Sequence, residues 1–340
     1  MATKYEERMK AKGFLSYHLD TLPAKFIQKA KEELGETDEI RQSALEQFRK
    51  RILEKVRDLL NLKSCSYATQ LIEIATVTLI TIPEYLWQQT LCMHGWSYDN
   101  MLKYPTDDEF LIQFLRARKY DVDKAMGLLN NYLNLITSHP DFLNNVDKEK
   151  MDKLTSDLFN VLPYRDNDGC LVVIFKIENW DSDDINEQVL FCTIGAILFC
   201  LSIHPANQIC GIRLIYDAKN YSFKQMRCFV PKYLPLVAKA LRNSLPIRFK
   251  DIHVVNEGIV FHCVWTFLSL LLSVKIRNRF YIHGNNTGKL QKHIPKEIIP
   301  REYGGDLINY NDDDWLKKEV DKFYDRFLMM VKSYFEKNCT

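Results

Sequence analysis

Several patterns that accompany enzyme chemistry are missing from this 340-residue chain. It has no G-x-G-x-x-G dinucleotide fingerprint and no G-x-S-x-G nucleophile elbow. The segment Gly284–Lys289 approaches a phosphate loop, but it has three residues between its glycines instead of four, and Leu290 follows the lysine. A surface turn explains this segment better. Catalysis therefore has no obvious place in the sequence. An enzyme such as a small hydrolase ranks behind the two non-enzymatic interpretations that are given at the end of this section.

Paired cysteines and metal-ligand spacings are missing as well. None of the nine cysteines forms a C-x-x-C pair, and most lie within apolar runs, as expected for buried thiols of a reduced cytosolic protein. His253, His262 and His283 could converge on a sheet, but no carboxylate or cysteine at ligand spacing accompanies them. We expect His253 to form hydrogen bonds within the core, and we predict no metal, no cofactor and no catalytic residue.

Long apolar segments are scarce. The first residues contain no apolar stretch, so we expect no secretory signal. Two uncharged runs, 188–204 and 258–274, stay below the ~18 residues that a membrane span requires and contain polar or histidine breaks. Buried helices are the better interpretation of both.

The first part of the chain has the apolar spacing of helices. A helix start at Thr37 precedes apolar residues at helical spacing as far as Leu60. The pattern Thr106-x-x-Glu109 is a capping box, and Asp121 begins a further helix. These signals predict an all-helical module over residues 1–150.

An atypical insertion at about residues 63–100 interrupts this module. Between Ser64 and Tyr98 only Glu73 and Glu84 are charged, and two of the five tryptophans lie there. The segment is an inserted loop or helix packed on the module, intron sequence translated through a faulty gene model, or a hairpin that touches a membrane. Transcript reads that skip the segment would support the second alternative.

The pattern changes after residue 150. Short β-branched or aromatic runs alternate with apolar helical segments, which implies right-handed crossovers and a mainly parallel sheet. The predicted class is therefore α/β over residues 151–307, followed by a helical tail at 308–340. Strands are expected at 171–177, 210–217, 252–255 and 280–283, with helices at 185–201, 223–241 and 259–276.

The stretch 245–306 combines basic and apolar residues. Seven lysines and arginines lie between Lys239 and Arg279 against two acidic residues, a local charge of +5 in a chain of net charge +2. Such unevenness favours a directed electrostatic contact. The run 259–274 is apolar nearly all round, so protein, a bound lipid or a bilayer must cover its second face.

Four cations flank this run. Arg248 and Lys250 project to one side of an extended segment, and Lys275 and Arg279 share a side if the helix continues that far. Together they could bind a phosphorylated lipid headgroup, and each contributes about 1 kcal/mol near an anionic surface. A solvated surface with charges at a helix end is the alternative.

Six ordered segments of the chain form a recognisable set: Thr106–Ala125, Arg165–Gly169, Gly211–Asp217, Ile252–Glu257, Ile282–Gly284 and Ile299–Gly305. They resemble the CRAL-TRIO (Sec14-like) lipid-binding family, near its tocopherol-transfer and retinaldehyde-binding branch. The resemblance implies an N-terminal helical module, followed by a CRAL-TRIO α/β domain whose apolar cavity is closed by a mobile gate helix.

The resemblance also implies roles for single residues. The matching cleft of the tocopherol-transfer branch binds phosphatidylinositol bisphosphate, here through Arg248, Lys250, Lys275 and Arg279. The gate is the helix 259–274, with Val264, Phe267, Leu268 and Leu271. The cavity would be lined by Phe191, Ile194, Leu198, Ile212, Phe229, Val237, Leu241, Leu245 and Ile252.

Two departures from the family pattern bear on these roles. Gly258 replaces a proline before the gate, which should change the flexibility of the gate. Ile194 and Leu198 replace small hydroxyl residues, which leaves a hydroxyl-bearing chromanol in question as the cargo.

The sequence therefore predicts a carrier and not an enzyme. The carrier would bind one hydrophobic small molecule, of tocopherol, retinoid or other lipid type, and exchange it at phosphoinositide-containing membranes. We expect a cytoplasmic, transiently membrane-associated monomer with no nucleic-acid partner. The alternative is a scaffold or regulatory lipid-sensing module that transfers nothing.

Overall fold

The structure, a computed structural model, describes residues 2–59, 107–137, 147–308 and 315–321. The predicted insertion at about residues 63–100 lies outside these ranges, and so does most of the predicted tail. Residues 315–321 are helical, and their Leu316 and Val320 are buried in the main core.

A five-stranded sheet forms the centre of the fold. The strands lie in the order β1-β2-β3-β4-β5; β1 is antiparallel to β2, and all other neighbours are parallel. This confirms the predicted α/β class with a mainly parallel sheet. The strands are β1 Phe159–Val161, β2 Leu171–Lys176, β3 Ile212–Asp217, β4 Phe249–Val255 and β5 Phe280–Ile282.

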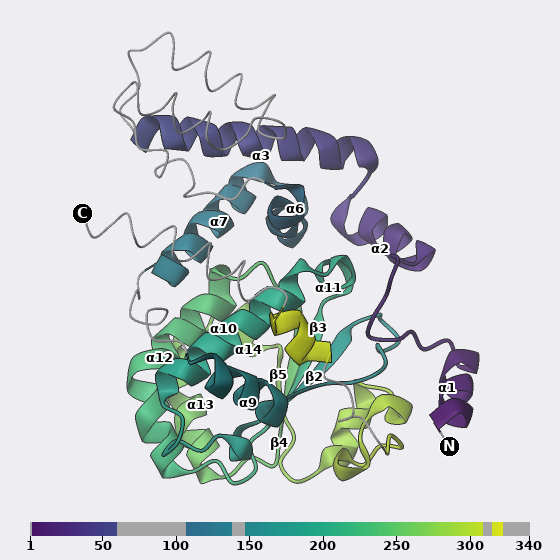
Figure 1. Cartoon of the computed structure of the whole chain (residues 1–340), viewed down its shortest axis with the longest axis vertical. Coiled ribbons are helices and arrows are strands. Elements are labelled where there is room, and N and C mark those ends of the chain that lie inside the picture. Colours follow the sequence, from purple (N-terminus) through teal and green to yellow (C-terminus); the bar gives the residue numbers. More distant parts are fainter. Residues whose placement is uncertain (1, 60–106, 138–146, 309–314, 322–340) are drawn as a thin grey trace.

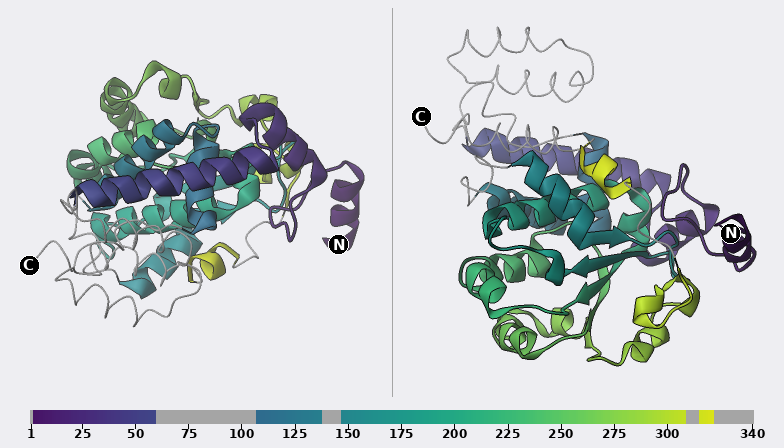
Figure 2. Two further views of the ribbon diagram at one scale, coloured as in Figure 1. Left: turned by 90° about the horizontal axis from the view of Figure 1, so that it is seen from above. Right: turned by 60° about the horizontal axis from the view of Figure 1, so that its bottom comes forward.

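Helices surround the sheet unevenly (Figures 1 and 2). The long helix α3 runs along the outer side of α6 and α7, and α10, α12 and α13 cover one face of the sheet. The helices are α1 Ala2–Ala11, α2 Ala24–Leu34, α3 Asp38–Leu59, α6 Asp108–Ala117, α7 Val122–Thr137, α9 Lys148–Leu158, α10 Glu187–Ile203, α11 Pro205–Cys210, α12 Phe223–Asn243, α13 Ile259–Leu271 and α14 Val274–Arg277.

Alternation along β2 divides its buried residues between two hydrophobic clusters. In β2, Val173 and Phe175 face the helices, whereas Val172 and Ile174 pack on the other side against residues 287–307. Both sets are buried, which is why β2 is apolar throughout instead of alternating with polar residues. The opposite face is covered by three short 3-10 turns, η3 Thr287–Lys292, η4 Lys296–Ile298 and η5 Arg301–Tyr303.

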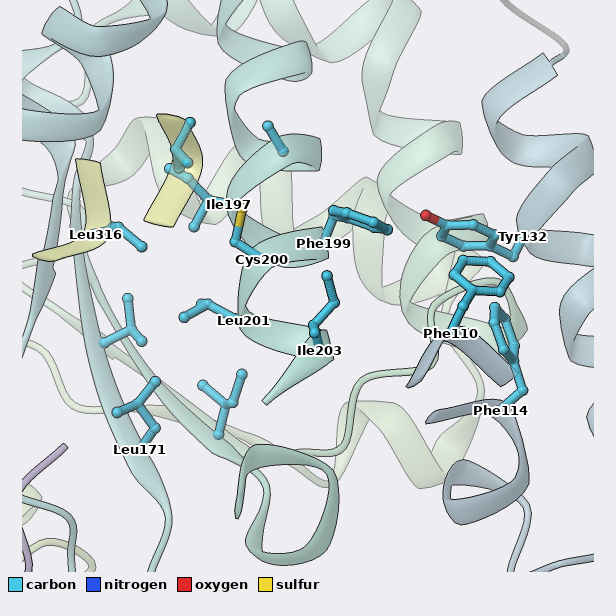
Figure 3. Packing of buried hydrophobic residues seen from close by; sticks show 14 of the residues in the cluster. Phe110, Phe114, Tyr132, Leu171, Ile197, Phe199, Cys200, Leu201, Ile203 and Leu316 are labelled. Atoms are coloured by element: carbon cyan, nitrogen blue, oxygen red, sulfur yellow. The ribbon is translucent and has the colours of Figure 1, made fainter. Parts of the chain in front are cut away.

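The helical module packs directly onto the α/β part. Phe110, Phe114 and Tyr132 contact one another with ring centroids 5.1, 6.2 and 5.5 Å apart. The same cluster continues to Phe199 and Leu201 of α10, as Figure 3 shows. Helix α6 begins one residue later than a cap at Thr106 would place it, because the Asp107 side chain accepts the Phe110 N–H at 2.8 Å.

The apolar helix after β4 is shorter than predicted. A single helix over 259–276, or a gate to Val274, is wrong: α13 ends at Leu271, and Leu272 is extended. Ser273 then caps the separate helix α14 in an extended conformation. Buried Leu272 turns the chain back toward the core, because it packs against Leu234 and Ala238 of α12. Among the described helices, none combines the length and apolarity needed to cross a bilayer.

Candidate functional site

An apolar cavity of about 310 Å³ lies between the sheet and helices α10, α12 and α13. Within the described parts of the chain, no charged side chain lines it. The structure places around it all nine residues that the sequence assigned to a lipid cavity. They are Phe191, Ile194, Leu198, Ile212, Phe229, Val237, Leu241, Leu245 and Ile252.

Further lining residues come from the strands and were missed in the sequence. Leu214 and Tyr216 follow Ile212 at intervals of two on β3, and Val254 follows Ile252 on β4. Strand periodicity alone would have identified them, because alternate residues of a strand share a face. By contrast, Tyr132 of α7 carries no such signal, since only tertiary packing brings the helical module to the cavity.

The four predicted gate residues point in two directions. Val264 and Leu268 of α13 are buried and line the cavity. Phe267 and Leu271 lie on the outer side of the helix, 60% and 41% exposed. Val264 and Leu268, four residues apart, share the cavity side of the helix. The helix thus presents apolar residues both to the cavity and to the outside.

The four predicted cations lie at the amino-terminal edge of the parallel strands. Arg248 and Lys250 flank the start of β4, Arg279 immediately precedes β5, and exposed Lys275 is on α14, which leads into β5. Helix α14 ends at Arg277, so Lys275 is helical and Arg279 lies beyond the helix. The condition on which the two cations were expected to share a helical side is therefore not met.

Acidic and carbonyl groups hold three of these cations. Arg248 donates to the Glu33 carboxylate of α2 at 2.5 Å and to the Ile209 carbonyl at 2.8 Å. The Lys250 ammonium lies 3.8 Å from the Asp168 carboxylate. Arg279 donates to the Phe249 carbonyl at 2.6 Å.

The charged groups at this edge shift one another's pKa values. Burial would raise the pKa of Glu33, but the hydrogen bond and charge of Arg248 bring it below its ordinary value. Burial lowers the pKa of Arg279, and the positive charge of Arg248 lowers it further. Two guanidinium groups therefore lie close enough to repel each other, and an added anion would relieve that repulsion.

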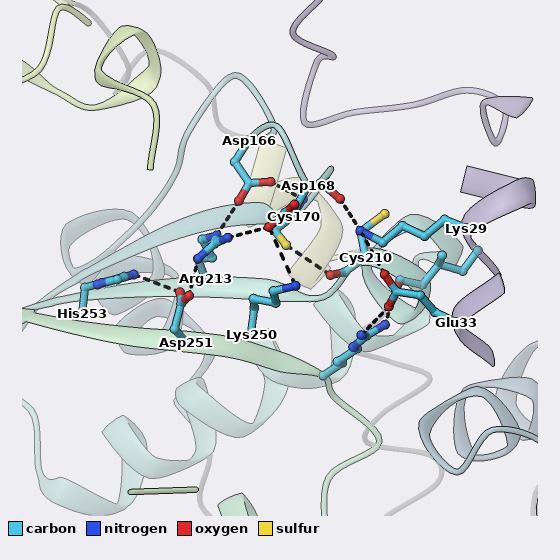
Figure 4. A network of polar contacts seen from close by, with 12 residues as sticks. Lys29, Glu33, Asp166, Asp168, Cys170, Cys210, Arg213, Lys250, Asp251 and His253 are labelled. Atoms are coloured by element: carbon cyan, nitrogen blue, oxygen red, sulfur yellow. Dashed lines mark hydrogen bonds and ion pairs between the residues drawn. The ribbon is translucent and has the colours of Figure 1, made fainter. Parts of the chain in front are cut away.

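His253 lies on the face of the sheet opposite the cavity (Figure 4), and the rings of His283 and His293 are beside it, at 5.2 and 4.9 Å between centroids. His253 shares hydrogen bonds of 2.9 Å with both Asp251 and His283, whereas His262 lies on α13. The expected hydrogen-bonding role of His253 agrees with this geometry. The carboxylate that the spacing did not reveal is Asp251, which comes two residues earlier on the same face of β4.

These groups belong to a larger polar network. Arg213 of β3 pairs with the carboxylates of Asp166, Asp168 and Asp251, at 2.8 Å for Asp168. Ligand-type atoms of Asp251, His253 and His293 lie within 4.8 Å of one another. Both ring nitrogens of His253 already have hydrogen-bond partners, so the arrangement is complete as a network that ties β3 to β4.

Fold and cavity together define a class of protein in which a helical module is joined to an α/β domain that encloses an apolar space. The chain belongs to the CRAL/TRIO family: the family model of the CRAL/TRIO domain matches residues 155–305, and that of the CRAL/TRIO, N-terminal domain matches residues 44–131. The family resemblance predicted from the sequence is thereby confirmed.

Individual relatives are similar over most of the chain. The human protein named "Alpha-tocopherol transfer protein-like" (Homo sapiens) is 31% identical over 278 residues, which cover 78% of this chain and 80% of that protein. Clavesin-1 of Rattus norvegicus is 34% identical over 215 residues, 62% of this chain and 61% of that protein. The crystal structure of Sfh5 matches with a TM-score of 0.42 and 13% identity, covering 82% of this chain and 98% of that one.

Proposed function

We propose that this protein is a non-enzymatic carrier that binds one hydrophobic small molecule in its cavity and exchanges it at phosphoinositide-containing membranes. The observation that carries the proposal is the cavity of about 310 Å³, closed by a helix that is apolar on both sides. Protein interiors are close-packed, so a space of this size lined by apolar side chains suits an apolar ligand. The carrier would act as a monomer in the cytoplasm and associate with membranes transiently.

The outer side of α13 supports docking to a bilayer. Ile259 and Leu270 are 71% and 76% exposed, and Val274 follows at 62%. Each such side chain contributes roughly 1.5–3 kcal/mol when it is fully inserted into an apolar phase. Exposed Lys275 and Arg277 adjoin this surface, and each adds about 1 kcal/mol near anionic lipid. These magnitudes suit reversible association, in which α13 moves and opens the cavity.

The cations at the amino-terminal edge of the strands, Arg248, Lys250, Lys275 and Arg279, support recognition of a headgroup. Phosphate oxygens accept hydrogen bonds from guanidinium and ammonium groups as carboxylates do, and they carry more charge. A bisphosphorylated inositol headgroup would replace Glu33 as the partner of Arg248 and Asp168 as the partner of Lys250. It would also neutralise the repulsion between Arg248 and Arg279.

Ligand occupancy is the direct test of a carrier. Native mass spectrometry of the purified full chain should show one apolar molecule bound per protein. The variant Leu198→Trp, which fills the cavity from α10, should lose that mass while it remains folded. A chain that never copurifies with a ligand and binds none on addition would contradict the proposal and favour a scaffold.

Docking is tested separately with vesicles that contain phosphatidylinositol bisphosphate. The double variant Arg248→Ala with Lys250→Ala should bind them about 30-fold more weakly, since each cation contributes about 1 kcal/mol. The matched control is Lys150→Ala with Lys153→Ala, which removes the same charge from α9 and should retain affinity. Equal affinity of both double variants would refute the headgroup site.

A further inference from the structure

Two tyrosines bring hydroxyl groups into a cavity that is otherwise apolar. Tyr216 is on β3, Tyr221 is in the connection between β3 and α12, and both line the cavity. They pack together against Val254 and Phe261, so they lie beneath the first turn of α13. The cavity therefore has a distinct end with two phenols.

These hydroxyls lack partners within the protein. In the described portion of the chain, neither phenolic oxygen forms a hydrogen bond, although both side chains are only half-buried and have accessible surface. The indole of Trp180, another lining residue, differs because it donates to the Ile185 carbonyl at 2.8 Å. The hydroxyl of Tyr132 also lacks a partner, but its oxygen is completely covered.

Both phenols remain protonated donors. Burial raises the pKa of Tyr216 well above its ordinary value, with a smaller contribution from Tyr221, and burial raises the pKa of Tyr221 to about 12. Each hydroxyl offers a donor that has no partner in the protein, so a ligand that supplies an acceptor gains affinity at this position.

The surroundings restrict the charge of that acceptor. Among the described lining residues there is no lysine, arginine or histidine to pair with an anion. A carboxylate or phosphate would lose its hydration without compensation, which is far costlier than for a neutral group. The site therefore suits an uncharged oxygen.

The strand direction sets the orientation of the ligand. Tyr216 is near the carboxyl end of β3, whereas Ile212 lines the cavity at its amino-terminal end, together with Leu245 and Phe249. Four residues of strand span about 13 Å. An apolar tail that starts at the phenols would thus run along β3 toward Ile212, past α10 and α12.

We propose that Tyr216 and Tyr221 hydrogen-bond the polar end of the ligand, and that the ligand is a lipid with a single neutral oxygen function such as an alcohol, aldehyde or ketone. This inference rests on the proposed carrier function, because it requires a ligand in the cavity. It adds the class of the ligand and its direction, with the polar end beneath the gate.

A matched pair of probes tests the proposal. Tritiated phytol, a branched C20 alcohol, is bound to the full chain and displaced by phytane, which has the same skeleton without the hydroxyl, or by phytanic acid. We expect phytol to bind about 5- to 30-fold more tightly than phytane, the range for one or two hydrogen bonds. Phytanic acid at pH 7.5 should bind more weakly than phytol.

The double variant Tyr216→Phe with Tyr221→Phe removes both oxygens and keeps the rings. It should bind phytol and phytane equally, with its phytane affinity unchanged, and its melting temperature without ligand should not fall. Tyr132→Phe is the matched control at the covered hydroxyl, and it should keep the preference for the alcohol.

Different failures have different meanings. An alcohol preference that survives in the double variant, or disappears in Tyr132→Phe instead, would overturn the assignment of the polar end. Tighter binding of phytanic acid would overturn the neutral ligand class. Equal binding of phytol and phytane by the unmodified chain would overturn this inference and leave the carrier function intact. Binding of neither, with no copurified ligand, would overturn both.

Discussion

The two faces of the sheet are built from alternate residues of the same strands, yet they are packed in opposite ways. On one face, Val172, Ile174 and Ile215 have no accessible surface, because residues 287–307 cover them. On the other, Leu214 and Tyr216 remain half-buried, because their free surface borders the cavity. The difference separates two tasks: the closed face holds the strands together, and the hollow face is available to a ligand.

Polar groups follow the same division. The closed face contains the network of Arg213, Asp251 and His253, in which each group has partners. The hollow face contains the phenols of Tyr216 and Tyr221 without partners among the described residues. Satisfied polar networks stabilise and specify a core, whereas unpaired polar groups need an explanation, which the proposed ligand supplies for Tyr216 and Tyr221.

The largest effect should come from breaking the network of the closed face. Arg213→Ala leaves the buried carboxylates of Asp166 and Asp251 without their cation, so we expect a loss of about 3–5 kcal/mol in the free energy of unfolding. Urea denaturation measures it. The control Lys219→Ala breaks only the exposed pair with Glu178 and should cost less than about 1 kcal/mol. Similar losses for both would contradict the assigned role of the network.

Adjacent residues of β3 provide the sharpest comparison of the two faces. Ile215→Ala on the closed face creates a new cavity and should destabilise the protein by about 2–5 kcal/mol. Leu214→Ala only enlarges an existing cavity, so its cost should be roughly half as large, with ligand affinity reduced. Urea denaturation of the ligand-free variants measures both. Equal costs would show that the hollow face is packed in solution.

Acid should lower the stability of the protein through the histidines of the closed face. Burial and the neighbouring His253 and His293 lower the pKa of His283 from 6.5 to about 4. A histidine with a lower pKa in the folded state takes up its proton more readily after unfolding, so stability is present above pH 6.5 and declines as the pH falls toward 4.

Between pH 7.5 and pH 5 this decline should amount to about 2 kcal/mol for His283. Urea unfolding at the two pH values measures it. In His283→Gln the difference between them should shrink by that amount, whereas the control His262→Gln, on the exposed side of α13, should behave as the unmodified chain. An unchanged pH dependence in His283→Gln would refute the assignment.

The smallest effect has the opposite sign. Val237→Phe fills part of the cavity from α12 and should increase the free energy of unfolding by about 0.5–1 kcal/mol, which raises the melting temperature slightly. Ligand binding should be lost. The same change on the closed face, Val255→Phe, overpacks a residue without accessible surface and should cost about 1–3 kcal/mol. Calorimetry distinguishes them, and destabilisation by Val237→Phe would mean that the cavity is already filled by protein.

Much of this architecture could be predicted because it depends on local periodicity. The apolar runs around 171–177 and 210–217 became β2 and β3, and the segment 223–241 became α12, which begins at the predicted residue Phe223 and extends to Asn243. The nine predicted lining residues come from α10, β3, α12, β4 and the connection after α12, and all of them border the cavity.

Other features depend on contacts between segments far apart in the chain. The break after Leu271 follows from the packing of Leu272 on α12, and no local helix breaker announces it. The pairing of Arg248 with Glu33 joins residues that are 215 positions apart in the chain. The role of Asp251 beside His253 was missed because a spacing of two on a strand does not match the ligand patterns of helices and loops.

The sequence by itself determined the class of the fold, the family and the apolar character of α13, because periodicity and motif order are properties of neighbouring residues. Only the tertiary structure decided which face of the sheet stays hollow, which cations are already paired, and that Tyr216 and Tyr221 meet beneath α13. These outcomes depend on how side chains from distant segments fill a common space, and the order of residues along the chain does not contain that information in readable form.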